Sequence, residues 1–261
     1  MIKFKLFFTL FLFAGTVMFI SCSKDDNNTN PPVDNNPVNF ESLKVGNYWI
    51  FENYNIDSLG NKTGSAETDS TYASGTVQKL GKTAYMLLNY SSDGTLKDTV
   101  YSYEEGKTYF THSSLINKKI AGFLDGFPVN PFDLGDIWMK VADYDQSSWD
   151  IMSQNLVDYP VYLGATINGT FSLKAAKGTT KTVTINSNAL TLQEFILTFN
   201  FKGTITMVTG EKQFSVVAHL WFDKKAGLLI TTFDNTNFDL GVLGGFPFQG
   251  TEKKAIRYKA Q

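Results

Sequence analysis

The stretch that decides the fold is Gln213–Phe222, whose sequence is QFSVVAHLWF. Its apolar residues take every second position: Phe214, Val216, Ala218, Leu220 and Phe222. Gln213, Ser215 and His219 fall between them. A period of two places one set of side chains on a buried face and the other in solvent, so the stretch predicts a half-buried antiparallel β-strand.

The same alternation recurs in Ile167–Ala175 and in Phe195–Lys202. Glycine-containing turn signals punctuate the chain at Asp93-Gly94, Glu105-Gly106, Lys177-Gly178 and Thr209-Gly210. At Asp93-Gly94 we expect the positive φ angles of a type I′ hairpin turn. Residues 40–261 are therefore predicted to form an all-β domain. It is expected to be a large antiparallel curved sheet, either an open half-barrel or a sandwich, of roughly ten to twelve strands.

One segment departs from the alternation. Ser147 and Asp150 have the spacing of a helix capping box, and Trp149 and Leu156 follow at helical intervals. The pattern predicts one short helix over residues 147–157, covering an open end or a face of the sheet.

The first residues have the anatomy of a secretion signal. Lys3 and Lys5 form a positive n-region, and Leu6–Ile20 is almost wholly apolar. An apolar run of this length suits a signal peptide and is too short to cross a bilayer core of roughly 30 Å. We therefore predict that residues 1–21 are removed on export.

The tetrapeptide Phe19-Ile20-Ser21-Cys22 resembles the lipobox of bacterial lipoproteins. The resemblance implies that Cys22 becomes a lipidated, palmitate-bearing N-terminus. It also implies that the partners include the membrane and the lipoprotein processing and export machinery. Cys22 is the one cysteine of the sequence, so no intramolecular disulfide competes for it. The alternative is an ordinary signal peptide with an incidental cysteine.

Residues 22–39 are predicted to be a flexible tether, because this Asn- and Pro-rich stretch cannot bury enough apolar surface to become ordered. Lys24, Asp25 and Asp26 look like the surface-export tether of Bacteroidota lipoproteins, and the alternative is a solvated spacer. The expected localisation is the outer membrane with the domain at the cell surface, or otherwise on the periplasmic face.

Composition limits the partners. The sequence has 23 basic and 25 acidic residues, a formal net charge of −2, and no basic run of the kind that binds nucleic acid. Aromatic residues make up 15% of the chain, with 22 phenylalanines. That share favours a large β core, since aromatic side chains are enriched in strands, and leaves a ligand-stacking surface as the alternative.

Two short echoes run through the chain. VGNYWI at Val45–Ile50 is matched by LGDIWM at Leu134–Met139, and Gly122–Pro128 is matched by Gly241–Pro247. They predict two related halves of the sheet, unless strand starts are simply alike.

The opening LKVGNYWIF (Leu43–Phe51) and the closing LWFDKKAGLL (Leu220–Leu229) are similar to segments that recur in Bacteroidota lipoproteins of unknown function. The two motifs touch both ends of the domain, cover a small part of it and carry no catalytic residue. The resemblance implies an open, curved antiparallel sheet comparable with lipid-carrier proteins of the cell envelope. That comparison is one of fold, and fold does not fix function.

Candidate catalytic residues are few. His112 and His219 are not spaced as a pair of metal ligands, so we expect structural roles for both, with His219 on the solvent face. The sequence has no Gly-x-Ser-x-Gly elbow and no P-loop, and Gly241–Gly245 is not expected to open a helix. We therefore predict a non-enzymatic protein with no catalytic residue, no metal and no cofactor.

Asp143, Asp145 and Asp150 begin like a calcium-binding loop. Ser148 and Gln154 replace the glycine and the glutamate that such a loop requires. These acids are expected to favour a helix start through the helix dipole. A glycosidase carboxylate pair elsewhere among the acids stays open.

The leading functional hypothesis is a membrane-anchored β lipoprotein that binds a glycan, lipid or protein ligand at the cell envelope. A carrier of hydrophobic molecules is the second, and a glycan or lipid hydrolase is the third. A half-barrel with an empty, phenylalanine-lined interior would favour the carrier. Two carboxylates facing one another in a polar cleft would favour the hydrolase, and a flat aromatic strip would favour glycan or protein binding.

The Gly-Phe-Pro segments offer a candidate ligand site. Phe127, Pro128, Phe246 and Pro247 fall outside clear strand alternation. They could form an apolar lip around one entrance to the sheet, held by the rigid prolines. The alternative is that both segments fold back as plugs and bury their rings.

Overall fold

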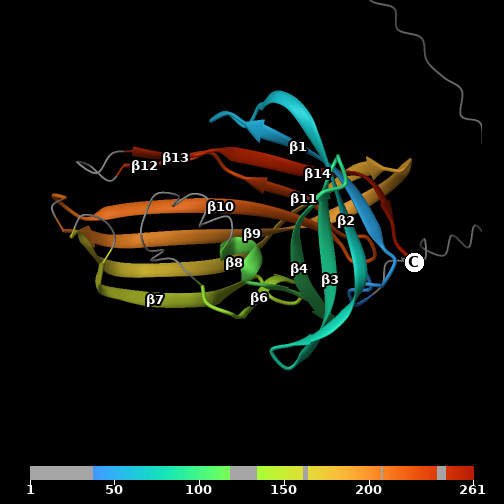
Figure 1. Ribbon diagram of the computed structural model, residues 1–261, viewed down its shortest axis with the longest axis horizontal. Helices are drawn as coiled ribbons and strands as arrows, with labels where there is room; N and C mark the ends of the chain where they lie inside the picture. The colour runs from blue at the N-terminus through green and yellow to red at the C-terminus, as the bar shows by residue number, and fades with distance from the viewer. Residues whose placement is uncertain (1–37, 118–133, 161–163, 207, 240–244) are drawn as a thin grey trace, which may run out of the picture. The chain divides into compact units, whose positions relative to one another are not determined.

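The protein is an all-β structure in the computed structural model (Figure 1), which describes residues 38–117, 134–160, 164–206, 208–239 and 245–261. The described residues contain these strands: β1 (Tyr48–Ile56), β2 (Lys62–Lys79), β3 (Lys82–Ser91), β4 (Leu96–Glu105), β5 (Thr108–His112), β6 (Trp138–Asp143), β7 (Ser148–Pro160), β8 (Thr166–Ile185), β9 (Asn188–Ile205), β10 (Lys212–Asp223), β11 (Gly227–Phe233), β12 (Thr236–Asp239), β13 (Gly245–Phe248) and β14 (Gly250–Lys259). The predicted all-β class is confirmed. Over the same residues, no helix is long and apolar enough to span a membrane.

Twelve of the described strands form one antiparallel sheet in the order β6-β5-β4-β3-β2-β1-β14-β11-β10-β9-β8-β7. The remaining two, β12 and β13, pair as a small ribbon. The edge strands β6 and β7 follow each other in the chain. The Trp149 indole on β7 donates to the Lys140 carbonyl on β6 at 2.8 Å. The sheet therefore curves until its edge strands β6 and β7 approach one another, and one of its faces is concave.

Bulges and glycines produce this curvature. The register shifts between Ile50 and Phe51 on β1 and between Lys177 and Thr180 on β8, and such bulges bend a strand and increase its twist. Gly169 and Gly203 lie opposite one another, and a Cβ on Gly203 would come within 2.2 Å of the Asn168 carbonyl oxygen. Figure 1 shows the result: β2–β4 run steeply across the direction of β7–β10.

The concave face holds the main apolar core. Its largest fully buried side chains include the rings Phe171, Phe195, Phe201 and Phe222. These residues come from β8, β9 and β10, the strands in which the sequence shows alternation. The period-two prediction for those strands is confirmed.

The far end of the β8–β9 hairpin covers part of the convex face. Trp221 faces away from the cavity that Leu220 and Phe222 line, and the Lys181 ammonium of β8 lies 3.8 Å from its ring centroid. Beyond it, the Asn186 side-chain amide donates to the Tyr258 carbonyl at 2.5 Å. The hairpin thus adds a second layer outside β10 and β14.

The helix predicted over residues 147–157 is wrong, because this segment is β7 and pairs with β8 from Ser148 to Pro160. Strand pairing outweighs the local capping-box signal, and a bulge between Asp150 and Met152 produces the irregular spacing of apolar residues. A helical turn occurs instead at residues 114–117, directly after β5.

Two predicted turns also differ. At Asp93-Gly94 only the glycine has a positive φ, of 82°, so the hairpin is not type I′. The Gly94 amide donates to the Ser91 carbonyl, as in a type I turn that ends in a left-handed glycine. Lys177-Gly178 is not a turn but the start of the β8 bulge. Asn186 and Ser187, with φ of 53° and 64°, have the positive φ angles that a type I′ turn requires.

Candidate functional site

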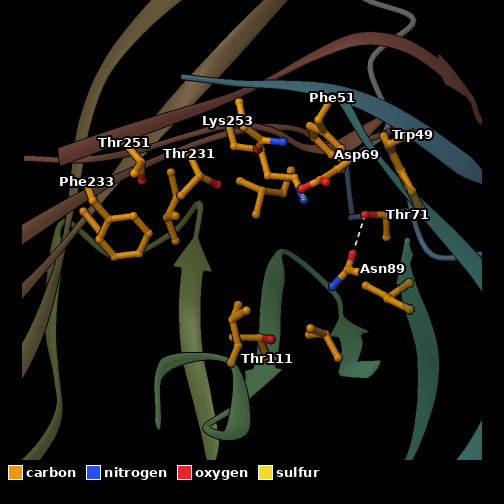
Figure 2. Close-up of a pocket in the computed structure, with 18 of the residues that line it drawn as sticks. Trp49, Phe51, Asp69, Thr71, Asn89, Thr111, Thr231, Phe233, Thr251 and Lys253 are labelled. Carbon is orange, nitrogen blue, oxygen red and sulfur yellow. Dashed lines mark hydrogen bonds and ion pairs between the residues drawn. The ribbon is translucent and has the colours of Figure 1, made fainter. Parts of the chain in front are cut away.

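The concave face of the sheet encloses a cavity of about 500 Å³. Strands from both halves of the sheet line it, and Figure 2 shows side chains converging on it from several directions. Asn55, Ser65 and Glu67 line one end and are exposed to solvent, so we call this end the mouth. Ser42 and Trp49 line the opposite end and are buried, so we call that end the closed end.

One side of the cavity is apolar. Leu197 on β9, Leu220 and Phe222 on β10, and Phe233 on β11 line it, and all four are buried. We call these four residues the apolar wall. Leu197, Leu220 and Phe222 occupy the inward positions of strands that the sequence identifies by strict alternation, so most of the wall is a product of the period-two pattern.

The other side is polar, and its main strand is β2. Ser65, Glu67, Asp69 and Thr71 take alternate positions on β2 and all line the cavity. Since neighbouring residues of a strand face opposite ways, the inward side of this half of β2 carries no large apolar group. Together with Asn89 on β3 and Lys97 and Asp98 on β4, these residues form what we call the polar wall.

Asp69 is the charged centre of the polar wall. It is 9% exposed, and its Oδ1 lies 2.6 Å from the Lys97 ammonium. Its Oδ2 lies 3.8 Å from the ammonium of Lys253 on β14. The hydrogen bond that the Lys97 ammonium donates to Asp69 raises the pKa of Lys97, and burial opposes this rise. Each lysine reaches across one strand to Asp69, and the Lys253 ammonium also lies 4.5 Å from the ring centroid of Phe51 (Figure 2).

A chain of hydrogen bonds crosses the polar wall beside this ion-pair cluster. The Thr71 hydroxyl donates to the side-chain oxygen Oδ1 of Asn89 at 2.5 Å (Figure 2), and the side-chain Nδ2 of Asn89 donates to the Asp98 carboxylate. These contacts fix the amide and present a row of oriented polar groups to the cavity. Thr111 on β5 faces them from across the cavity.

The chain before β1 blocks the closed end. The Phe40 ring packs edge-on against Tyr109 and Phe222 at centroid distances of 5.6 and 5.8 Å. The Glu104 carboxylate accepts hydrogen bonds from the Ser42 hydroxyl and amide and from the Leu43 amide. Burial raises the pKa of Glu104, against the lowering effect of these hydrogen bonds.

The buried Trp49 continues the closed end. Its indole donates to the Ala226 carbonyl at 2.6 Å. Gly227, at φ +83°, lies against Ser42, and a Cβ there would come within 2.9 Å of the Ser42 hydroxyl oxygen. Both motifs of the family resemblance, residues 43–51 and 220–229, therefore meet at the closed end.

Neither histidine belongs to the cavity lining. His112 lies on the other face of β5, with Nδ1 2.9 Å from the Ser114 hydroxyl and Nε2 2.6 Å from Asp136. Burial lowers the pKa of His112, and Lys79 adds to the effect. His219 lies on the convex face, between Glu194 at 2.8 Å and Asp234 at 3.5 Å. It is half-buried there rather than fully solvated.

The hydrogen bonds around Glu194 support a structural role for His219. Burial raises the pKa of Glu194, but the hydrogen bonds that the carboxylate accepts from Thr179 and His219 outweigh it and lower the pKa overall.

The three acids that resemble a calcium loop do not converge. Asp143 pairs with Lys140 at 3.0 Å, Asp145 with Lys107 at 2.8 Å, and Asp150 with Lys174 at 3.4 Å. The helix-dipole explanation is wrong because no helix starts here. Across the described part of the chain, no three His, Cys, Asp or Glu side chains form a group that could hold a metal ion.

Several predicted site residues lie outside the described residues: Cys22, Lys24, Asp25, Asp26, Phe127 and Pro128. The sequence places Phe246 and Pro247 outside the strand alternation and so predicts a loop. The structure differs, because both residues belong to strand β13. Of the echoed starts, Gly46 and Gly135 share a positive φ, of 93° and 67°, just before β1 and β6.

The polar wall is the part of the candidate site that the sequence does not predict. The available signal is the run SAETDSTYAS at residues 65–74, a strand-length stretch with hydroxyls on both faces and both of its acids on one face.

The chain matches no protein-family model and no curated protein. Solved structures with a similar chain course include a provisionally named lipoprotein from Parabacteroides distasonis ATCC 8503, at 11% identity and a TM-score of 0.40, covering 85% of this chain and 100% of that one. A provisionally named exported protein with a YmcC-like fold from Bacteroides fragilis NCTC 9343 has 10% identity, a TM-score of 0.38 and the same coverage. The hypothetical lipoprotein YmcC from Escherichia coli K12 has 11% identity and a TM-score of 0.28, covering 80% of this chain and 83% of that one. These likenesses say nothing of what the cavity binds.

Proposed function

We propose that this protein is a lipid-anchored protein of the bacterial envelope whose β domain binds a small ligand in the concave cavity without converting it. The carrying observation is the lining, which opposes an apolar wall to a polar wall around about 500 Å³. Small-molecule sites are typically roughly 300–1,000 Å³, mostly apolar, with a few placed polar groups. The cavity has that combination.

The contacts of the polar wall favour binding over hydrolysis. A general acid or base must be free to exchange its proton with a substrate. Asp69 is held by Lys97, and Asp98 accepts a hydrogen bond from Asn89. The carboxylate with the raised pKa, Glu104, is committed to Ser42 and Leu43 at the closed end. Such contacts hold the groups in place for recognition.

A pair of neighbouring threonines provides the test. Thr231 lines the cavity, whereas Thr232 lies opposite His219 on the convex side of β11. We expect Thr231→Trp to fill the cavity and abolish binding of the neutral dye N-phenyl-1-naphthylamine, measured by fluorescence. Thr232→Trp should bind the dye like the unmodified protein. Equal binding by the two variants would show that the cavity is not the binding site.

The envelope anchor is tested separately. Cys22→Ala should release the protein from membranes or leave it unprocessed, measured by membrane fractionation and electrophoretic mobility. Unchanged attachment and mobility would contradict lipidation.

Surface display depends on the tether residues. Replacing Lys24, Asp25 and Asp26 by alanine should protect the protein from protease added to whole cells. Equal digestion of wild type and variant would rule out this tether.

A carrier of hydrophobic molecules remains the second candidate, favoured by the apolar wall. A carrier must release its ligand as well as bind it. It would therefore accelerate transfer of a fluorescent lipid between vesicles, whereas a binding protein would deplete the donor vesicles only stoichiometrically.

A further inference from the structure

We propose that the ligand is an uncharged amphiphile, with a polyhydroxylated headgroup against the polar wall and an apolar chain along the apolar wall. This inference rests on the proposed function, since it names the class of molecule that the cavity takes. It follows from the charges, the unused hydrogen-bonding capacity and the arrangement of the two walls.

The charges of the cavity lining compensate one another. Among the described lining residues, three carboxylates (Glu67, Asp69 and Asp98) oppose two ammonium groups (Lys97 and Lys253), a formal charge of −1. Both ammonium groups lie near the same carboxylate, at 2.6 and 3.8 Å. An anionic headgroup would have to displace Asp69 from them and would also face Glu67 and Asp98. The wall therefore disfavours phosphate, sulfate and carboxylate headgroups.

A cationic headgroup is disfavoured by the same cluster. The Lys97 ammonium already occupies Asp69, at 2.6 Å from Oδ1. The Lys253 ammonium lies over the Phe51 ring, at 4.5 Å, which is the aromatic face that a ligand cation would otherwise use. Beyond Glu67 at the mouth, an added cation would meet these two positive charges beside Asp69.

Hydroxyl groups of a ligand can donate to the hydrogen-bond acceptors of the polar wall that remain unused. An ionised carboxylate offers about four acceptor sites, and the described contacts of Asp98 use one of them. The Thr71 hydroxyl donates to Asn89 and still has acceptor capacity. Alcohol groups donate to such acceptors without bringing a charge. Several hydroxyls on one headgroup would match the row of polar groups on β2, β3 and β4.

The apolar part of the ligand follows from the opposite wall. Leu220 and Phe233 face the same cavity as Asp69, so a headgroup at the polar wall places its chain against them. Burying an alkyl chain there removes apolar surface from water, which favours an amphiphile over a free sugar. The exposed Ser65 and Glu67 at the mouth mark the side from which the ligand enters.

The experiment compares headgroups on one chain. The mature protein with Cys22→Ala is titrated with octyl β-glucoside, octyl phosphate, octyltrimethylammonium and free glucose, all below micelle formation, and tryptophan fluorescence is recorded. We expect the glucoside to bind at least about tenfold more tightly than each of the other three. Equal affinity of the octyl compounds, or preference for a charged one, would overturn the headgroup assignment. Equal affinity for glucose would overturn the apolar chain.

Two variants separate this inference from the proposed function. Asp98→Leu should reduce glucoside affinity to that of the charged amphiphiles while leaving binding of the neutral dye unchanged. Asp150→Leu, which removes an exposed acid of β7, is the matched control and should change neither. If the dye binds normally but Asp98→Leu leaves glucoside preference intact, the headgroup site is wrong and the cavity stands. If the dye itself does not bind, the proposed function fails.

Discussion

The two walls of the cavity belong to one sheet but obey different rules. The apolar wall comes from β9–β11, where large inward side chains such as Phe222 pack against rings from across the fold. The polar wall comes from β2–β4, where inward side chains contact one another through ion pairs and hydrogen bonds. Asp69 pairs with Lys97, and Asn89 accepts a hydrogen bond from Thr71. Burying polar groups is costly unless they are partnered, whereas burying rings is favourable in itself. The comparison teaches that burial of rings holds one wall, whereas pairing between polar groups holds the other.

The largest expected effect comes from the apolar wall. Phe222→Ala removes a fully buried ring that contacts Phe40, Tyr109 and Phe195. We expect the free energy of unfolding to fall by about 3–5 kcal/mol, measured by urea denaturation. Val157→Ala, at a position 75% exposed, is the control and should change it by less than about 0.5 kcal/mol. A small loss for Phe222→Ala would mean that this wall is not the core.

The next effect is expected at Trp49, on β1 at the closed end where the two walls meet. Trp49→Phe leaves the buried Ala226 carbonyl without its indole donor, which should lower the free energy of unfolding by about 1–3 kcal/mol. Trp149→Phe removes a similar hydrogen bond at a half-buried position, where water can replace the donor. If the two variants lose equal stability, burial does not decide the cost.

A third test uses pH and the polar half of the sheet. Burial raises the pKa of Glu104 above its ordinary value of 4.5, so the folded protein binds this proton more tightly than the unfolded chain. Its contribution to stability is therefore fully present below pH 4.5 and is lost as pH rises through the raised pKa. Glu104→Gln cannot ionise and should flatten this part of the stability profile in denaturation series at several pH values. An unchanged profile would contradict the assignment.

The smallest effect on stability is expected within the polar wall. The double variant Thr71→Val, Asn89→Leu replaces two hydrogen-bonding partners with apolar groups of similar size, and such exchanges are close to neutral. Asp98 also loses its Asn89 donor, but this carboxylate is only partly buried, so water can replace the donor. The free energy of unfolding should change by less than about 1 kcal/mol, whereas affinity for octyl β-glucoside should fall at least about tenfold. Loss of stability comparable with that of Phe222→Ala would make the polar wall structural.

The same contrast explains how much of the molecule the sequence predicts. Strict alternation in Phe195–Lys202 and Gln213–Phe222 predicts β9 and β10, and with them most of the apolar wall, because burial of large side chains leaves a period in the sequence. Asp69 and Thr71 leave no such period, since β2 is polar on both faces. The role of Asp69 depends on Lys97 and Lys253, and that of Thr71 on Asn89; these partners are distant in sequence and are brought close by strand order. The helix prediction for the segment around Trp149 is wrong for a related reason, because pairing of β7 with β8 overrides the local helical spacing of its apolar residues.

The segment that leads into β1 has a mechanical consequence. The Phe40 amide donates to the Gly106 carbonyl in the β4–β5 turn, and the Glu41 amide donates to the Lys224 carbonyl in the β10–β11 turn. One short strap thus fastens both halves of the sheet at the closed end. A tensile force applied to the chain at Val38 is therefore shared between the two halves at the closed end.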